Sequence, residues 1–348
     1  MQMCSRFLNF ETSKSKVLSL SPMNKTFTFL SVISLTAALV TSCGDNQPTP
    51  YTTEEALGEA LFFDPMLSRD STISCASCHK PELAFADNTP TSKGVGGRSG
   101  NRNTPSSMNM SDRNFYFWDG RAETLEEQAL GPIENHVEMD LPLTIAVRRL
   151  KQNKMYTASF LAVYNAQPTK ELIASAIAAF ERTLETSKSP FDRYLKGIDT
   201  NSYPTAAKRG LNIFNTKGRC FDCHFGVDFT GSDKFKNIGI YNGKNLNDKG
   251  RFDVTGNPAD MGKFKTPGLR NIALTAPYMH NGMHKTLREV IDYYNNPDEF
   301  IPDAINRDTL LSRPLGLTED EKKDLEAFLN TLTDDRFTKS TATKAGSH

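Results

Sequence analysis

The chain has 348 residues, of which 38% are hydrophobic and 24% are charged, which is ordinary for a soluble protein and long enough for two domains. Its 41 basic and 41 acidic residues balance, and no run of Lys or Arg stands out, which argues against nucleic acid as a partner. Six cysteines are too few for a disulfide-based scaffold of this length.

The first segment, residues 1–43, has the pattern of an export signal. The stretch from Met23 to Cys43 has a basic start, an apolar segment too short for a permanent span, and small residues before the cysteine. Its end, VTSC, is similar to a bacterial lipobox, in which the cysteine carries the lipid; an ordinary signal peptide with an incidental cysteine is the alternative. Because residues 1–22 do not fit before such a signal, we expect Met23 to be the initiator and Cys4 to be lost. The pattern predicts a periplasmic or cell-envelope protein, lipid-anchored at Cys43.

The remaining sequence predicts a mainly α-helical protein of two units with long loops and little β structure. Residues 44–51 are a polar tether, residues 52–200 the first unit, residues 201–335 the second unit and residues 336–348 a polar tail. Each unit carries one copy of a cysteine motif near its beginning.

Capping residues and apolar periodicity place the helices within these units. Thr52 and Glu55 have the spacing of a capping box, which predicts the start of the first helix. Residues 85–114, rich in Gly, Asn, Ser and Pro, predict a long irregular loop, and loops of that length are usually functional. Similar signals predict helices at 124–130, 143–150, 170–185 and 204–214, and from Thr286 and Thr318.

The cysteine motif is CxxCH, and it occurs in ISCASCHK and in GRCFDCHFG. Two cysteines separated by two residues can bond to the vinyl groups of one haem, and the adjacent histidine then lies under the iron. A zinc site made of both cysteine pairs is the main alternative, but zinc gives no reason for a histidine after each pair. Disulfide redox chemistry is the other alternative, but no thioredoxin-like βαβ pattern surrounds the motifs. The sequence predicts two haems c, attached at Cys75, Cys78 and His79 and at Cys220, Cys223 and His224.

From about Glu55 to Thr333 the chain resembles the bacterial di-haem cytochrome c peroxidases and the related MauG-type enzymes. The resemblance rests on the runs LGEALFFDPMLSRDSTISCASCH, RNTPS, FYFWDGRAETLEEQALGPIENHVEM, SPFDRYLKG and LRNIALTAPYMHNG together with the two CxxCH motifs. It implies two cytochrome c-like haem domains, one for each motif. Hydrogen peroxide would react at the N-terminal haem, and electrons from a small cytochrome c would enter through the C-terminal haem.

The same resemblance assigns the catalytic residues. Cleavage of peroxide needs an open axial position on the iron and a base that moves a proton between the two oxygens. Glu138 matches the distal acid of the family, and Gln128 and Pro132 match its pocket partners. Trp118, the only tryptophan, matches the residue that carries charge between the haems. Without the resemblance, Glu138 would be read as a surface carboxylate and Trp118 as a core residue.

A calcium site between the two domains is also implied. Asn103, Thr275 and Pro277 match the family's site, and the latter two would supply backbone carbonyl oxygens, which suit Ca²⁺. His280 matches the family as well, and we interpret it as a packed, hydrogen-bonded residue near the second haem. Family members are often dimers, so a homodimer is possible, but nothing in the sequence identifies its surface.

Two positions depart from the classical pattern. Many members have a histidine in the loop after the first motif that blocks the N-terminal iron, and the matching position is Val95. We therefore expect that iron to be open in the resting state. At the C-terminal haem the classical distal ligand is a methionine, and the matching position is Tyr294, which helical spacing puts on a buried face with Met279 and Met283 as rival ligands.

Three functions follow from these residues. The first is reduction of hydrogen peroxide to water, the second is MauG-type oxidation of a protein or other substrate through a high-valent two-haem state, and the third is electron transfer alone. The overall resemblance favours the first, and Tyr294 favours the second. Glu138 and an open iron argue against the third, since a carrier needs six-coordinate iron.

Overall fold

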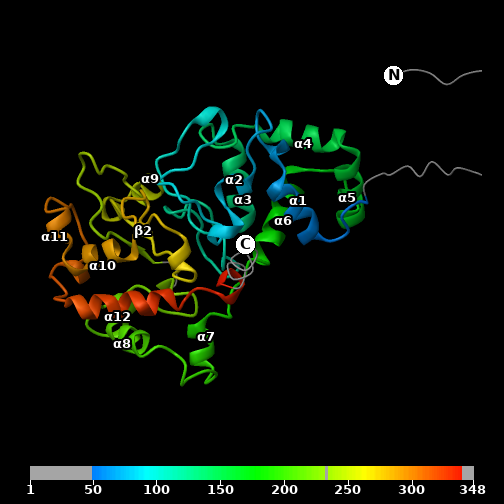
Figure 1. Ribbon diagram of the computed structural model, residues 1–348. Coiled ribbons are helices and arrows are strands. Elements are labelled where there is room, and N and C mark those ends of the chain that lie inside the picture. Colours follow the sequence, from blue (N-terminus) through cyan, green and yellow to red (C-terminus); the bar gives the residue numbers. More distant parts are fainter. Residues whose placement is uncertain (1–48, 232–233, 339–348) are drawn as a thin grey trace, which may run out of the picture. The chain divides into compact units, whose positions relative to one another are not determined.

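The structure is a computed structural model that describes residues 49–231 and 234–338, which lie in one compact unit (Figure 1). The predicted export signal with Cys43, most of the tether and the tail from residue 339 fall outside the described residues. Over the ranges described, no helix combines the length and the apolar character required to cross a membrane.

The first half of the chain forms a helical lobe, which we call the N-lobe (residues 49–186). Its core contains apolar side chains from every helix except the short α2, with Leu57, Ile133 and Phe160 fully buried. Figure 1 shows α1 beside α6, with α4 and α5 nearby. The helices are α1 (Glu54–Phe63), α2 (Cys75–Cys78), α3 (Leu125–Glu134), α4 (Leu143–Gln152), α5 (Lys154–Tyr164) and α6 (Lys170–Arg182).

The second half forms the C-lobe (residues 187–338). Helix α7, which the predicted boundary at residue 200 assigns to the first unit, packs into the second core, where the ring of Phe191 lies 5.3 Å from that of Phe328. The C-lobe helices are α7 (Pro190–Leu195), α8 (Thr205–Asn215), α9 (Phe252–Thr255), α10 (Leu287–Asn295), α11 (Pro297–Phe300) and α12 (Glu319–Asn330).

β structure is minor in the described ranges. Strands β1 (Phe235–Lys236) and β2 (Phe264–Lys265) form one antiparallel pair in which Phe235 lies opposite Lys265. The predicted fold class, mainly α with long loops and little β, is confirmed. One helix start was wrong by one residue: Thr53, not Thr52, is the N-cap of α1, because its hydroxyl accepts from the backbone N–H of Ala56 at 3.2 Å.

Each lobe is built on a close crossing of two helices. In the N-lobe, Gly58 of α1 meets the carbonyl of Ala176 in α6, where a Cβ would lie 1.8 Å from that oxygen. In the C-lobe, Gly210 of α8 meets the carbonyl of Asp324 in α12 in the same way, at 1.9 Å. Glycine is required at both crossings because any side chain would overlap the facing backbone. The two lobes therefore repeat one helix-pair architecture, and in each the CxxCH motif follows the first helix of the pair.

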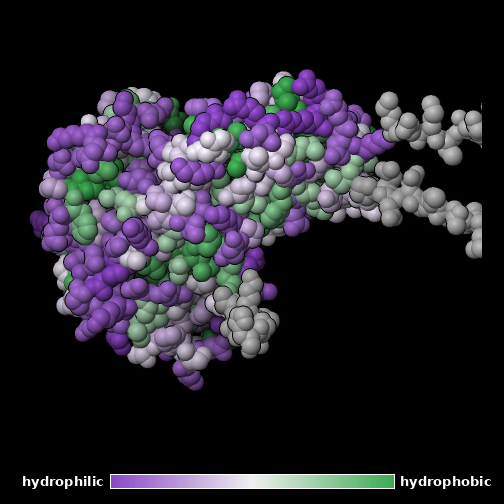
Figure 2. Space-filling model, turned by 45° about the horizontal axis from the view of Figure 1, so that its top comes forward, coloured by the Kyte–Doolittle hydropathy of each residue, from purple (hydrophilic) through white to green (hydrophobic). Residues whose placement is uncertain are grey.

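The outer surface agrees with a globular protein. Figure 2 shows a face dominated by hydrophilic side chains, with apolar side chains in scattered patches. Large exposed apolar residues such as Phe63, Leu195 and Val227 come from separate elements of the fold. Such scattered exposure is normal and does not by itself mark a binding surface.

Candidate active site

The first CxxCH motif forms a single helical turn that directs its histidine into the N-lobe. The backbone N–H of His79 donates to the carbonyl of Cys75 at 2.9 Å and so closes the turn of α2. The Nδ1 atom of His79 lies 2.9 Å from the carbonyl oxygen of Phe85. Because a carbonyl can only accept, Nδ1 carries the proton, which leaves Nε2 with a lone pair for a metal.

The second motif repeats this geometry in the C-lobe. The backbone N–H of His224 donates to the carbonyl of Cys220 at 2.8 Å, and its Nδ1 lies 2.8 Å from the carbonyl of Phe229. Phe85 and Phe229, the two acceptors, both have left-handed backbone conformations, with φ of 56° and 60°. A φ in that region is uncommon for a bulky residue, and here it turns a carbonyl toward each histidine.

Burial keeps the motif side chains neutral. It lowers the pKa of His79 and of His224, so that both rings are neutral imidazoles, the form that binds metals. Burial also raises the pKa of the Cys75 thiol and raises that of Cys220 to about 12, so that neither is a thiolate. In the part of the chain that the structure describes, no three His, Cys, Asp or Glu side chains are grouped so that they could hold a metal ion.

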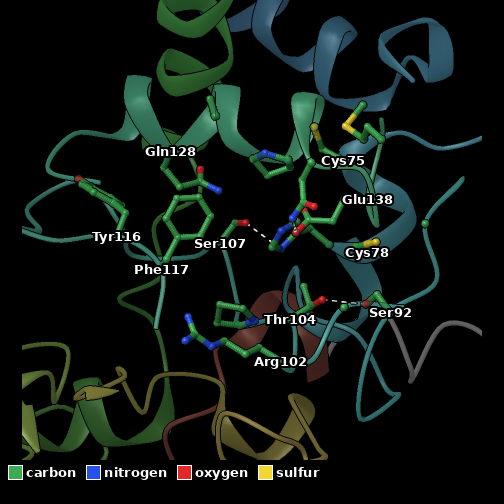
Figure 3. A pocket seen from close by; sticks show the side chains of 18 of the residues that line it. Cys75, Cys78, Ser92, Arg102, Thr104, Ser107, Tyr116, Phe117, Gln128 and Glu138 are labelled. Carbon is green, nitrogen blue, oxygen red and sulfur yellow. Dashed lines mark hydrogen bonds between the residues drawn. The ribbon is translucent and has the colours of Figure 1, made fainter. Parts of the chain in front are cut away.

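A cavity of about 240 Å³ lies beside the first motif. It unites residues that are up to 119 positions apart in the sequence, from Phe62 to Glu181, and Figure 3 shows Gln128, Glu138 and Cys78 around the same space. The neutral thiols, the free imidazole nitrogen and the mainly apolar surface of the cavity fit a haem. The predicted residues that line the cavity are Cys75, Cys78, His79, Asn103, Trp118, Gln128, Pro132 and Glu138.

Glu138 supplies a carboxyl group to the wall of this cavity. It follows α3, and its Oε1 accepts a hydrogen bond from the side-chain amide of Asn135 at 2.7 Å. Burial raises the pKa of Glu138, while the charge of Arg121 and the bond from Asn135 oppose the rise. Such a carboxyl can release and accept a proton closer to neutral pH than an exposed one.

The cavity also contains an acid that the sequence analysis missed. Glu181 in α6 is only 5% exposed, lines the cavity, and its Oε2 has no hydrogen-bond partner. Burial raises its pKa to about 8. The signal was present in the sequence: Glu181 is four residues after Ile177 and therefore continues the apolar face of its helix.

Comparison with known proteins identifies the family. Residues 52–200 match the model of the di-haem cytochrome c peroxidase family. The methylamine utilization protein MauG of Methylorubrum extorquens is 37% identical over 81% of this chain and 79% of its own. Cytochrome c551 peroxidase of Nitrosomonas europaea is 38% identical over 83% of this chain and 82% of its own. The chain belongs to the di-haem cytochrome c peroxidase family.

A solved structure agrees with this assignment. The crystal structure of a MauG-like protein associated with microbial copper homeostasis is similar with a TM-score of 0.74 and 33% identity, over 85% of this chain and 96% of that one. As a di-haem peroxidase the protein is an oxidoreductase with two haems, and the two CxxCH histidines and their surroundings are the described groups that fit them.

In this peroxidase Trp118 lies between the cavity and the C-lobe. Its Nε1 donates to the carbonyl of Asn103 at 2.9 Å, and its own carbonyl accepts from the backbone N–H of Lys265 in β2 at 2.8 Å. Its ring lies edge-on to that of His280, at 6.4 Å between centroids. Trp118 also lines a second cavity of about 90 Å³ that is bounded by C-lobe residues such as Arg270. It thus contacts both lobes.

Of the three residues predicted to bind calcium, Asn103 lies beside Trp118 and His280. Asn103 is buried, its backbone N–H donates to the carbonyl of His280 at 2.7 Å, and its side-chain amide donates to the carbonyl of Thr89 at 3.0 Å. Thr275 and Pro277 belong to the segment that leads to His280, with a cis bond before Pro277.

Val95 is the residue predicted to match the blocking histidine of classical members, and it lies in the loop after the first motif. It is 4% exposed, and its backbone N–H donates to the carbonyl of Glu138 at 2.8 Å. The neighbouring Gly94 is packed against the same turn, where a Cβ would lie 2.4 Å from the Glu138 carbonyl. The loop is thus fixed against the backbone of Glu138 by a residue that cannot bind iron.

The candidates for the second haem's distal ligand differ in burial. Burial raises the pKa of the Tyr294 phenol most, and Tyr293 and the two cysteine sulfurs of the second motif raise it further. The effect of these sulfurs shows that Tyr294 lies close to the second motif. Helical spacing predicts that Tyr293 points away from the buried face of its helix, and this prediction is wrong. Tyr293 is fully buried, and its hydroxyl donates to the carbonyl of Ile238, just after β1, at 2.7 Å. Met283 is 37% exposed, whereas Met279 packs beside both tyrosines.

Proposed function

We propose that the protein reduces hydrogen peroxide to water in the N-lobe cavity, with electrons that arrive through the C-lobe. The observation that carries this proposal is the placement of Glu138, a buried carboxyl with a raised pKa, in the same cavity as the first CxxCH motif. A protein that only carries electrons would have no use for such a group. Family membership supports hydrogen peroxide as the substrate and a cytochrome as the donor.

The two haems are held covalently in this proposal. Cys75 and Cys78 form the thioether bonds of the first haem, and Cys220 and Cys223 form those of the second. The free Nε2 atoms of the two motif histidines, His79 and His224, are the iron ligands. When bound, the first haem supplies an iron that changes its oxidation state during peroxide reduction.

Side chains of the cavity transfer the proton and hold the reacting groups in place. Glu138 takes a proton from one oxygen of the peroxide and returns it to the other, so that the second oxygen leaves as water. The hydrogen bond from Asn135 holds the carboxyl in place between these transfers. Gln128 supplies an amide that orients peroxide from the same wall, and Pro132, inside α3, offers no backbone donor to compete for it. Because the side chain of Val95 cannot bind iron, the site at which peroxide binds is open in the resting protein.

Electrons pass from the C-lobe to the N-lobe by way of Trp118. Its contacts with both lobes support this role, and its Nε1 is held by a backbone carbonyl, which fixes the ring. Asn103, Thr275 and Pro277 hold one calcium ion that ties the two lobes together beside this tryptophan. The electron donor is a small cytochrome c, and the protein is exported to the periplasm or cell envelope with a lipid at Cys43; a homodimer is its proposed assembly.

Two measurements test the function. Steady-state oxidation of a reduced cytochrome c by hydrogen peroxide is expected to be rapid and to cease when peroxide is left out. The resting protein is expected to give a high-spin ferric EPR signal, because Val95 cannot close the first iron. Absence of peroxide-dependent turnover would remove the peroxidase proposal, and a resting spectrum with low-spin haem alone would remove the open-iron proposal.

A second function is favoured by one observation. Tyr294 lies close to the second motif and is partly buried, and a phenolate ligand stabilises ferric iron more than a thioether does. That arrangement suits a MauG-type enzyme, which oxidises a protein or other substrate through a high-valent two-haem state. Slow turnover together with a long-lived spectral change after peroxide addition would support this function over rapid peroxide reduction.

A further inference from the structure

Glu181 is a buried acid that the proposed mechanism does not use. Its side chain lines the N-lobe cavity, its residue is 5% exposed, and its Oε2 lacks a hydrogen-bond partner. Leaving a buried polar atom unpaired costs folding stability. A leucine would fill this position without that cost, so the acid requires an explanation.

The C-lobe supplies an internal comparison. Helices α6 and α12 play the same part in their lobes, because the carbonyls of Ala176 and Asp324 receive the crossing glycines. Glu181 is five residues after the first carbonyl, and the residue five positions after the second is Leu329, which is buried in the C-lobe core. The acid is therefore present in the lobe that contains the peroxide cavity and replaced by an apolar residue in the other.

The residue after Glu181 belongs to an ion pair that is partly exposed to solvent. The next residue, Arg182, forms an ion pair with Glu126 of α3 at 2.8 Å, and these two side chains are 43% and 34% exposed. On the cavity side the charged form of Glu181 faces Cys75 of α2 and raises the pKa of that thiol. Glu181 itself is influenced by burial first, then by Arg182, which lowers its pKa, and by Glu126, which raises it.

We propose that Glu181 is the proton-uptake residue of the peroxide cavity, taking protons from solvent at the Glu126–Arg182 pair and passing them inward. This inference rests on the proposed function, because reduction of hydrogen peroxide to two waters consumes two electrons and two protons. The oxygen–oxygen bond breaks, the electrons come from the donor protein, and both protons come from solvent. Glu138 only moves a proton that peroxide brings with it, so a second group must deliver the protons that solvent supplies.

The titration of Glu181 suits this task. With a pKa of about 8, the carboxyl is protonated at neutral pH and can give its proton to the cavity. The resulting carboxylate is buried and takes up another proton, since burial favours the neutral form. Its unpaired Oε2 is available to hold a water molecule between it and the cavity.

The test compares the haem-loaded wild-type protein with Glu181→Gln, which keeps the shape and removes the titratable proton. We expect peroxide turnover to fall by about tenfold or more in dilute buffer, and to recover partly as the concentration of a small buffer acid is raised. The infrared carbonyl signal of a buried, protonated carboxylic acid should persist up to about pH 8 in the wild type and be absent from the variant. Glu59→Gln, which removes an exposed acid of α1, should change none of these.

Haem content and visible spectra of each variant separate this role from a structural one. Glu181→Leu, which copies Leu329, should load haem normally and show the same loss of turnover without loss of stability. Equal turnover and equal buffer dependence in the wild type and Glu181→Gln would overturn the proposal, as would an infrared signal that Glu181→Gln leaves unchanged. If the wild type itself reduces no peroxide, the proposed function fails instead.

Discussion

The buried carboxyl of Glu181 should make folding stability depend on pH. Its folded pKa of about 8 lies above the ordinary value of 4.5, so between these values the folded chain keeps a proton that the unfolded chain has released. Stability therefore falls as pH rises through this interval and levels off above it. The interval is about 3.5 pH units, and at about 1.4 kcal/mol for each unit the loss is at most about 5 kcal/mol.

Urea unfolding of the haem-loaded protein at several pH values measures this effect. Glu181→Gln has no proton to lose, so its free energy of unfolding should match the wild type near pH 4.5 and exceed it increasingly toward pH 8. The exposed-acid variant Glu59→Gln should follow the wild type at every pH. A difference between wild type and Glu181→Gln that does not change with pH would refute the reasoning, because it would mean that Glu181 is ionised in the folded protein.

Three further changes test other parts of the structure. Gly210→Ala should destabilise the C-lobe by about 1–3 kcal/mol or more, because the new methyl would lie 1.9 Å from a carbonyl of α12; Gly100→Ala, where the nearest atom is 3.9 Å away, should be tolerated in the same thermal unfolding assay. Tyr294→Phe should alter the spectrum and raise the reduction potential of the second haem. The control Tyr293→Phe, at the fully buried neighbouring residue, should leave that spectrum unchanged. Arg121→Gln removes a charge that lowers the pKa of Glu138, so the acidic limb of the pH–rate profile should move to higher pH by up to about one unit.

The features that the sequence predicted well are local ones. The two CxxCH motifs, the cap of the last helix at Thr318 and the apolar face of α6 each depend on residues within a few positions of one another. Their geometry is set by single turns and helix periodicity, so a short window of sequence contains the necessary information. The fold class followed because weak β patterning and two similar helical units are visible without tertiary contacts.

The features that were missed depend on packing between distant segments. Helical spacing puts Glu181 on the apolar face of α6, but it does not show that this part of the face lines a cavity, since that depends on other helices. Tyr293 is covered by a loop some 55 residues earlier, to which its hydroxyl donates a hydrogen bond. The start of α1 was predicted one residue too early, at Thr52 instead of Thr53, because the two adjacent threonines have equal capping ability. Long-range burial is what separates a catalytic acid from a surface one, and periodicity cannot supply it.

The central claim is that the N-lobe cavity reduces peroxide with Glu138 as its acid–base group. The most direct measurement is kcat/KM for hydrogen peroxide with reduced cytochrome c, for the wild-type protein and for Glu138→Gln at equal haem content. The account predicts a fall of about 10²–10⁴ in the variant with its haem spectra otherwise intact. Equal rates in the two proteins would contradict the account and place the chemistry elsewhere.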